Sequence, residues 1–310
     1  MLINKITNKI HPEFTDYLRA VFPAFKVQKI SLNAGFTCPN RDGTKGRGGC
    51  TYCNNRTFNP DYCDNGKSIT EQLSEGINFF SRKYPAMKYI AYFQAYTNTY
   101  DKVENLRLKY EEALSHKEVA GIIIGTRPDC VSVELLDYLQ ELNRRTFVMV
   151  EYGIESASEE TLLRINRGHT YEEAKDAVIR TAERDIPVGA HLIAGLPGET
   201  REQFLRHASI ISELPLTSIK LHQLQIIRGT AMGKEYESHP ERFHLYTVDE
   251  YIDLVIEFID RLRPGIYIDR FISQSPKELL LAPDWGLKNH EFKSRLERKL
   301  ASGNSNKNHK

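Results

Sequence analysis

The chain has 310 residues, 40% of them hydrophobic and 27% charged, so it can bury a large core as one domain or as two small ones. Its 42 basic and 41 acidic residues give a net charge of +1, which neither demands nor excludes a nucleic-acid partner, because only clustered charge would matter. No segment reads as a signal peptide or approaches the length of a membrane span, so we expect a cytoplasmic protein with no membrane partner.

After an N-terminal extension over residues 1–24, short apolar runs alternate with longer segments of helical spacing. The predicted strands cover residues 27–32, 88–94, 120–125, 147–153, 188–195 and 218–226, with a further candidate at 266–271. The predicted helices cover residues 68–83, 103–116, 132–144, 170–184, 200–213 and 247–262. Ser68 with Glu71, Ser132, and Thr170 with Glu173 are the expected N-caps.

Several predicted strands, such as GIIIG and FVMV, are apolar throughout, which is typical of a parallel sheet covered on both faces. Repeated strand–helix units predict a parallel α/β protein, either an incomplete barrel or an open doubly wound sheet. Ligands bind at the carboxyl ends of the strands in both. We expect one catalytic domain over residues 25–272, followed by a basic C-terminal extension over 273–310 whose end is disordered.

Three of the five cysteines fall in one short loop after the first predicted strand. Cys38, Cys50 and Cys53 have the spacing C-x11-C-x2-C, in a segment rich in Gly, Pro, Asn and Asp. The total is too small for a disulfide scaffold, and thiols inside cells stay reduced. The clustering therefore indicates metal or redox chemistry.

The spacing leaves several kinds of site open. A zinc site would recruit a fourth ligand, such as Cys63 or a histidine. A redox disulfide would use Cys50 and Cys53 and leave Cys38 unexplained. An iron–sulfur cluster held by three thiolates would leave one iron free for another ligand. Free structural cysteines are the weaker interpretation, because the loop is polar and offers no apolar pocket.

Four further segments accompany the cysteine loop in chain order. They are GTRPDC (125–130), EYGIESASEETLLRINRGHT (151–170), HLIAGLPGET (191–200) and IKLHQLQIIRGTAM (219–232). With the three cysteines, this series resembles the radical S-adenosylmethionine (SAM) superfamily. The cysteine spacing is similar to that of the branch with the YhcC/YtqA-type proteins and the catalytic subunit of Elongator. The resemblance implies an incomplete (β/α)6-type TIM-like barrel.

The resemblance also implies the cofactors. In the superfamily, three thiolates hold a [4Fe–4S] cluster, here through Cys38, Cys50 and Cys53, and SAM chelates the fourth iron. An electron, from a donor such as flavodoxin or ferredoxin, cleaves SAM to a 5′-deoxyadenosyl radical that abstracts a substrate hydrogen. The protein then contributes positioning and exclusion of water. Cys63 is not a ligand in this interpretation.

The same resemblance assigns the SAM-binding side chains. Gln94, in the loop after the second strand, is expected near the SAM amino group, although the loop could be an ordinary polar connection. Glu155 stands where a ribose-binding residue is expected, and Ser156 either joins it or caps the following helix. Arg167 matches a position that pairs with the SAM carboxylate; the alternative is a solvated charge. Gly195 would let the backbone approach the adenine, or would serve tight packing.

Strand alternation places His191 on one side with Gly189 and Ile193, and His222 on one side with Lys220 and Leu224. If these sides face the barrel lumen, the histidines lie beneath the cofactor. A histidine in a strand is otherwise usually a satisfied core residue. The combination of His191, His222 and Lys220 on adjacent strands favours a polar pocket.

The substrate is suggested by the resemblance alone. Elongator builds a side chain on the wobble uridine of tRNA, and YtqA-type proteins are linked to conversion of carboxymethylaminomethyl to aminomethyl on that base. A tRNA partner would use basic residues, which concentrate near the C-terminus at Lys288, Lys293, Arg295, Arg298, Lys299, Lys307 and Lys310. The alternative functions are a radical SAM enzyme acting on a protein or metabolite and a zinc-stabilised binding module. The alternative for the basic C-terminal segment is a solvated helix.

Overall fold

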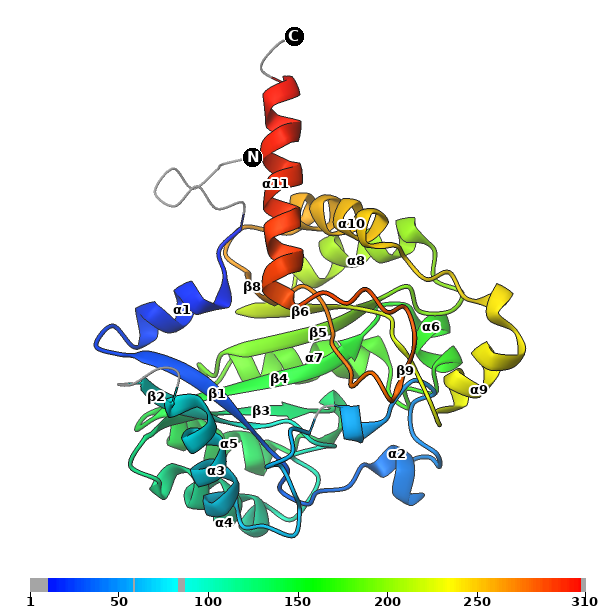
Figure 1. Ribbon diagram of the computed structural model, residues 1–310. Helices are drawn as coiled ribbons and strands as arrows, with labels where there is room; N and C mark the ends of the chain where they lie inside the picture. Colours follow the sequence, from blue (N-terminus) through cyan, green and yellow to red (C-terminus); the bar gives the residue numbers. More distant parts are fainter. Residues whose placement is uncertain (1–10, 58, 83–86, 308–310) are drawn as a thin grey trace.

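The computed structural model describes residues 11–57, 59–82 and 87–307. Its centre is a parallel sheet of seven strands in the order β1-β2-β3-β4-β5-β6-β8 (Figure 1). These strands are β1 (Lys26–Leu32), β2 (Met87–Phe93), β3 (Val119–Thr126), β4 (Phe147–Glu155), β5 (Val188–Ala194), β6 (Ser218–Gln223) and β8 (Tyr267–Arg270). Spatial order follows chain order without a reversal, which is the topology of a partial barrel and not of a doubly wound sheet. The predicted incomplete barrel is confirmed.

The expected strand over residues 218–226 is two elements in the structure. β6 ends at Gln223, and Ile226–Ile227 form β7, which pairs antiparallel with β9 (Leu280–Ala282) outside the main sheet. Apolar residues recur past Gln223 at Leu224, Ile226 and Ile227, so hydrophobicity alone could not place this break.

Helices follow the strands and cover the outer face of the sheet. The main ones are α3 (Ile69–Ser81), α4 (Val103–Ser115), α5 (Val133–Asn143), α7 (Tyr171–Ala182), α8 (Arg201–Ser212) and α10 (Val248–Arg261). Ser68 and Thr170 form the expected capping boxes with Glu71 and Glu173, and Ser132 accepts a hydrogen bond from the amide of Leu135. The short helices are α2 (Pro39–Asp42), α6 (Glu159–Arg164) and α9 (Ala231–Ser238).

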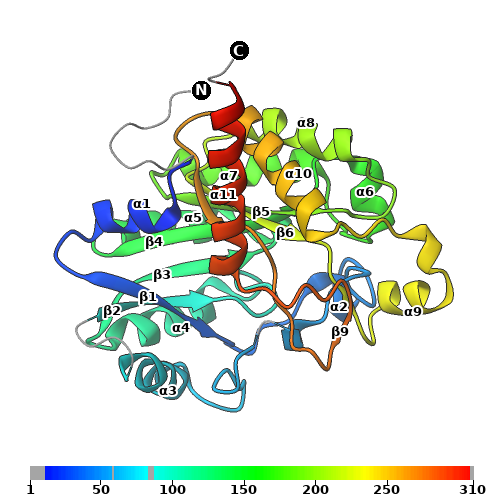
Figure 2. The ribbon, with the colours of Figure 1, turned by 45° about the horizontal axis from the view of Figure 1, so that its top comes forward.

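The described part of the N-terminal extension, residues 11–24, packs against the barrel. Its helix α1 (Phe14–Val21) buries Phe14 and Leu18 against Ile90, Ile123 and Met149. Figures 1 and 2 show α1 at the end of the barrel opposite the loops that carry α2 and α9, and α1 contacts β8 there. The helix therefore closes the amino-terminal end of the barrel.

The basic C-terminal segment is a helix that packs on the domain. Phe292, Leu296 and Leu300 of α11 (Asn289–Lys307) are buried, and α11 lies beside α10 (Figure 2). Two of its lysines are in ion pairs, Lys293 with Glu13 and Lys299 with Asp253. The expected disordered tail is helical to Lys307, and residues 308–310 lie outside the described part of the chain. None of the helices described is long and apolar enough to cross a membrane.

Candidate active site

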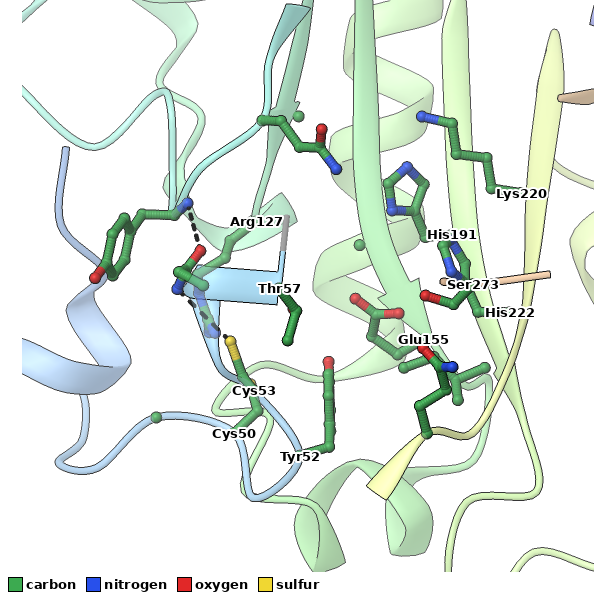
Figure 3. A pocket seen from close by; sticks show the side chains of 18 of the residues that line it. Cys50, Tyr52, Cys53, Thr57, Arg127, Glu155, His191, Lys220, His222 and Ser273 are labelled. Atoms are coloured by element: carbon green, nitrogen blue, oxygen red, sulfur yellow. Dashed lines mark hydrogen bonds between the residues drawn. The ribbon is translucent and has the colours of Figure 1, made fainter. Parts of the chain in front are cut away.

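A cavity opens at the carboxyl ends of the strands, and every strand from β2 to β6, together with β8, contributes to its wall. The loop with the three clustered cysteines covers one side, and His191, His222 and Ser273 lie on the other (Figure 3). The residues that line the cavity include Cys38, Arg41, Cys50, Cys53, Asn55, Tyr92, Gln94, Thr97, Arg127, Glu151, Glu155, Arg167, His191, Lys220, His222, Gln225, Arg270, Ser273 and Ser275.

Cys38, Cys50 and Cys53 line this cavity, whereas Cys63 and Cys130 do not. All five are free thiols. The Cys63 thiol is buried and donates to the carbonyl oxygen of Ser31 over 2.8 Å, and burial raises its pKa to about 12. Cys63 therefore has a structural partner and does not join the three clustered thiols.

Local sequence explains how the loop brings the thiols to the cavity. Cys38 is the N-cap of α2, whose first residue is a proline with the backbone angle that a helix start requires. Gly49 has φ +80° and packs against Arg41, whose Nε would lie 2.8 Å from an added Cβ. A side chain at this position would therefore displace Arg41 and strain the backbone.

Asn40 joins the cysteine loop to the segment after α6. Its Nδ2 donates to the carbonyl oxygen of Asn166 over 2.6 Å and lies 3.8 Å from Sγ of Cys50. In return, Nδ2 of Asn166 donates to the carbonyl oxygen of Gly49 over 2.9 Å. These reciprocal bonds fix the loop against the NRGHT motif, in which Arg167 is the next residue.

The three clustered thiols share one cavity. Within the described residues, no group of three His, Cys, Asp or Glu side chains is arranged to hold a single metal ion. A [4Fe–4S] cluster takes each thiolate on a different iron, and three thiols that line one cavity are compatible with that requirement.

Cationic and polar N–H groups surround the thiols. Nη1 of Arg167 lies 3.4 Å from Sγ of Cys50, and Nδ2 of Asn55 lies 3.7 Å from Sγ of Cys53. Arg41 donates to the carbonyl oxygen of Cys53 over 2.6 Å. Burial raises the pKa of the Cys53 thiol to about 11, so a thiolate here needs a bound cation or metal centre.

Three of the residues expected to bind SAM lie at the cavity beside the cysteine loop. Gln94 accepts a hydrogen bond from the hydroxyl of Ser31 over 3.0 Å. Glu155 ends β4 with φ +72°, an unusual angle for a carboxylate residue, and its Oε1 lies 3.6 Å from Nη2 of Arg167. The nearby hydroxyl of Thr97 is buried and has no partner within the described part of the chain, as expected of a group that meets a ligand.

Two other residues expected to bind SAM, Ser156 and Gly195, lie outside this cavity. Ser156 is fully buried, does not line the cavity and donates to Oε1 of Glu199 over 2.6 Å. The expectation that it caps the next helix is wrong, because the side chain that accepts from the first turn of α6 belongs to Ser158. Gly195 does not line this cavity either; with φ +88° it lies in a separate hollow against Tyr246. Its position favours the packing interpretation.

His191, Lys220 and His222 all face the cavity, which confirms the predicted polar pocket. His191 and Lys220 belong to a larger charged group on the barrel floor, here called the floor network, which consists of Lys29, Tyr92, Glu151, His191, Lys220 and Asp269. The Lys220 ammonium lies 2.5 Å from Oε2 of Glu151 and 2.9 Å from the Tyr92 hydroxyl. Lys29 lies 2.6 Å from Oδ2 of Asp269 and 3.4 Å from Oε1 of Glu151.

Most of the floor network, and the polar residues of the loop over the cysteines, were not predicted from the sequence. A signal was present, because Glu151 directly follows the apolar run FVMV in β4 and Lys29 is a charged residue inside β1. Such a residue must face either solvent or a polar interior. Tyr52, Asn55 and Thr57 also line the cavity, and their loop carried no periodicity from which their direction could be predicted.

Comparison with known proteins agrees with this geometry. The family model described as "Radical SAM superfamily" matches residues 38–211, more than half of the chain. The chain belongs to the radical SAM superfamily. A second model, "Radical_SAM C-terminal domain", matches residues 216–302.

Individual radical SAM relatives support the predicted branch. The chain is 37% identical to "Uncharacterized protein YtqA" of Bacillus subtilis over 300 residues, which cover 96% of this chain and 92% of that protein. It is 28% identical over 177 residues to "Elongator complex protein 3" of Mus musculus, covering 56% of this chain and 31% of that protein.

A solved structure of archaeal Methanocaldococcus infernus Elp3 matches with a TM-score of 0.66 at 17% identity. The match covers 90% of this chain and 63% of that one, and it supports the barrel fold alone.

The superfamily cofactors are a [4Fe–4S] cluster and SAM, and the residues at the cavity fit both. Cys38, Cys50 and Cys53 are the thiols that would hold the cluster. Gln94, Thr97, Glu155 and Arg167 offer acceptors and a guanidinium on the adjacent wall, where an amino acid and a ribose can bind.

Proposed function

We propose that this radical SAM enzyme acts on the wobble uridine of tRNA and converts its carboxymethylaminomethyl side chain to aminomethyl. The observation that carries the proposal is the similarity to the Elongator subunit over 177 residues. The similarity to YtqA supports assignment of this chain to the YtqA-type branch. The cavity is open at the carboxyl ends of the strands, where a side chain carried by a large substrate can enter.

The residues that line the cavity would then have separate binding roles. Cys38, Cys50 and Cys53 hold the cluster, Glu155 binds the SAM ribose, and Arg167 binds the SAM carboxylate. When bound, these cofactors supply a carbon radical that abstracts a hydrogen atom from the substrate, with an electron from a donor such as flavodoxin or ferredoxin.

In this proposal, the substrate binds at the wall opposite the cysteine loop. Helix α1 packs beneath the floor network at the amino-terminal side of the barrel. The Lys29 ammonium lies 4.5 Å from the centroid of the Phe14 ring, so an aromatic side chain of that helix covers part of the charged floor.

The test is the nucleoside profile of tRNA from a strain that lacks this gene. We expect carboxymethylaminomethyluridine to accumulate at the wobble position and aminomethyluridine to be lost. The wild-type gene restores the profile, and the Cys50→Ala variant does not. An unchanged profile in the deletion strain contradicts the tRNA proposal and leaves a protein or metabolite as the substrate.

A further inference from the structure

One wall of the cavity carries two polar side chains, those of His222 and Arg270, that are left unsatisfied by the described residues. This wall, here called the β6–β8 wall, consists of His222, Gln225, Arg270, Ser273 and Ser275, all of which line the cavity. Figure 3 shows His222 and Ser273 across the cavity from Cys50 and Cys53. A substrate that reaches a cofactor on the cysteine side would contact the β6–β8 wall.

Arg270 is the unpaired cation of the cavity. It is exposed at the end of β8 and forms no ion pair or side-chain hydrogen bond with any other described residue. The other three arginines that line the cavity are engaged: Arg41 with the Cys53 carbonyl, Arg127 with Asp129, and Arg167 with Cys50 and Glu155.

The floor network does not neutralise Arg270. Its two ammonium groups, on Lys29 and Lys220, are matched by the two carboxylates of Glu151 and Asp269. The guanidinium of Arg270 is therefore a surplus positive charge at the β6–β8 wall. An exposed guanidinium facing a cavity is suited to a carboxylate, which it can bind through two parallel hydrogen bonds.

His222 supplies a second unsatisfied group. Its Nε2 is buried and has no hydrogen-bond partner among the residues that the structure describes. Burial, His191 and Arg270 hold the pKa of His222 well below its ordinary value, so the ring is neutral near pH 7. A neutral imidazole has one nitrogen with a free lone pair, which can accept a hydrogen bond from an ammonium or amine.

We propose that the β6–β8 wall binds a zwitterionic, N-substituted glycine group of the substrate. Arg270 pairs with its carboxylate, and Nε2 of His222 accepts a hydrogen bond from its ammonium. The inference rests on the proposed function, since the carboxymethylaminomethyl side chain ends in such a group. It adds that Arg270 recognises the portion that the reaction removes.

The experiment measures equilibrium binding by fluorescence anisotropy, using the reconstituted full-length enzyme with SAM and no reductant. Three anticodon stem-loops are compared, with carboxymethylaminomethyluridine, aminomethyluridine or uridine at the wobble position. We expect the wild-type enzyme to bind the first about tenfold more tightly than the second, because only the first has the carboxylate. Arg270→Gln should bind these two equally.

Two further variants test the role of His222 and control for the loss of a positive charge. His222→Phe should lose affinity for both amine-containing stem-loops and keep its affinity for the uridine stem-loop. Arg228→Gln is the matched control, because Arg228 is exposed, lies outside the cavity and pairs with Glu237. It should keep the wild-type preference. Far-ultraviolet circular dichroism checks that each variant is folded.

Equal binding of the first two stem-loops by the wild-type enzyme, or a preference retained by Arg270→Gln, overturns the inference. If the wild-type enzyme binds none of the three RNAs, the tRNA proposal has failed separately. The wall is then probed with N-methylglycine, which is the end of that side chain alone. A saturable shift of the His222 imidazole NMR signals in wild type but not in Arg270→Gln supports the inference, and no shift in wild type overturns it.

Discussion

The Nη1 atom of Arg167 lies 3.4 Å from Sγ of Cys50, although the two residues are 117 positions apart in the chain. The same guanidinium donates from Nη2 to the carbonyl oxygen of Gly153 over 2.5 Å and faces Oε1 of Glu155. One buried cation thus connects a thiol of the cysteine loop to the end of β4. The contact joins the expected cluster site to the expected SAM site.

We predict that Arg167→Gln shifts the reduction potential of the reconstituted cluster to more negative values by on the order of tens of millivolts. Removal of a positive charge and of an N–H···S contact disfavours the reduced, more negative cluster. Arg167→Lys should give a smaller shift, because it keeps the charge. Redox titration followed by electron paramagnetic resonance measures the potential, and a Gln variant with the wild-type potential contradicts the prediction.

Cys50→Ala should prevent assembly of a stable cluster, whereas Cys63→Ser should not. Cys50 lines the cavity, while Cys63 is bonded to Ser31 outside it, and a serine hydroxyl can replace that donor. Anaerobic reconstitution with iron and sulfide, followed by visible absorbance and iron analysis, compares the two variants. Loss of the cluster in Cys63→Ser would show that the fourth thiol is needed after all.

Lys220→Met should destabilise the protein by about 3–5 kcal/mol, because it leaves Glu151 with too little positive charge in a buried site. Adding Glu151→Gln should recover part of the loss, since the uncompensated carboxylate is then gone. Urea unfolding at neutral pH measures all three proteins. A double variant no more stable than Lys220→Met would contradict the charge-balance argument for the floor network.

The floor network also predicts an acid dependence. Burial opposes ionisation of Glu151, but Lys220 and Lys29 outweigh it and hold the pKa of this carboxyl well below its ordinary value. The stabilisation is therefore present above pH 4.5, the ordinary value, and is lost as pH falls through the lower folded-state pKa. In Glu151→Gln, the free energy of unfolding should change less over that acidic range.

Glu199, in the GLPGET motif, and His207 should also make the stability of the protein depend on pH. Their two effects have opposite signs. Burial raises the pKa of Glu199 to about 7, so its contribution to stability is lost as pH rises from about 4.5 to 7. Burial, with Arg206, lowers the pKa of His207 to about 4, so its contribution is gained as pH rises from about 4 to 6.5.

These two effects oppose each other and partly cancel across this range. Relative to wild type, Glu199→Gln should make the free energy of unfolding rise more steeply with pH, and His207→Asn should make it rise less steeply. Urea unfolding at several pH values measures the slopes. Parallel slopes in the two variants would contradict the assignment.

Local sequence predicted much of the frame on which the site is built. The order of strands and helices and the caps at Ser68, Ser132 and Thr170 are confirmed, because each depends on residues close together in the chain. The three cysteines line one cavity, and their role as cluster ligands stays a prediction. Ser156 and Gly195 were assigned to the cofactor, and the structure places both outside the cavity. Their surroundings come from Glu199 and Tyr246, which local spacing cannot position.

The sequence by itself determined that this chain forms parallel strand–helix repeats and presents three thiols after the first strand. Only the tertiary structure decided which charges meet on the barrel floor and which remain unpaired. Lys29 and Asp269 are 240 residues apart, and Lys220 and Tyr92 are 128 apart, yet each pair is within 2.9 Å. Closure of the curved sheet brings them together, because side-chain periodicity fixes the face of a strand but not its partner across the barrel.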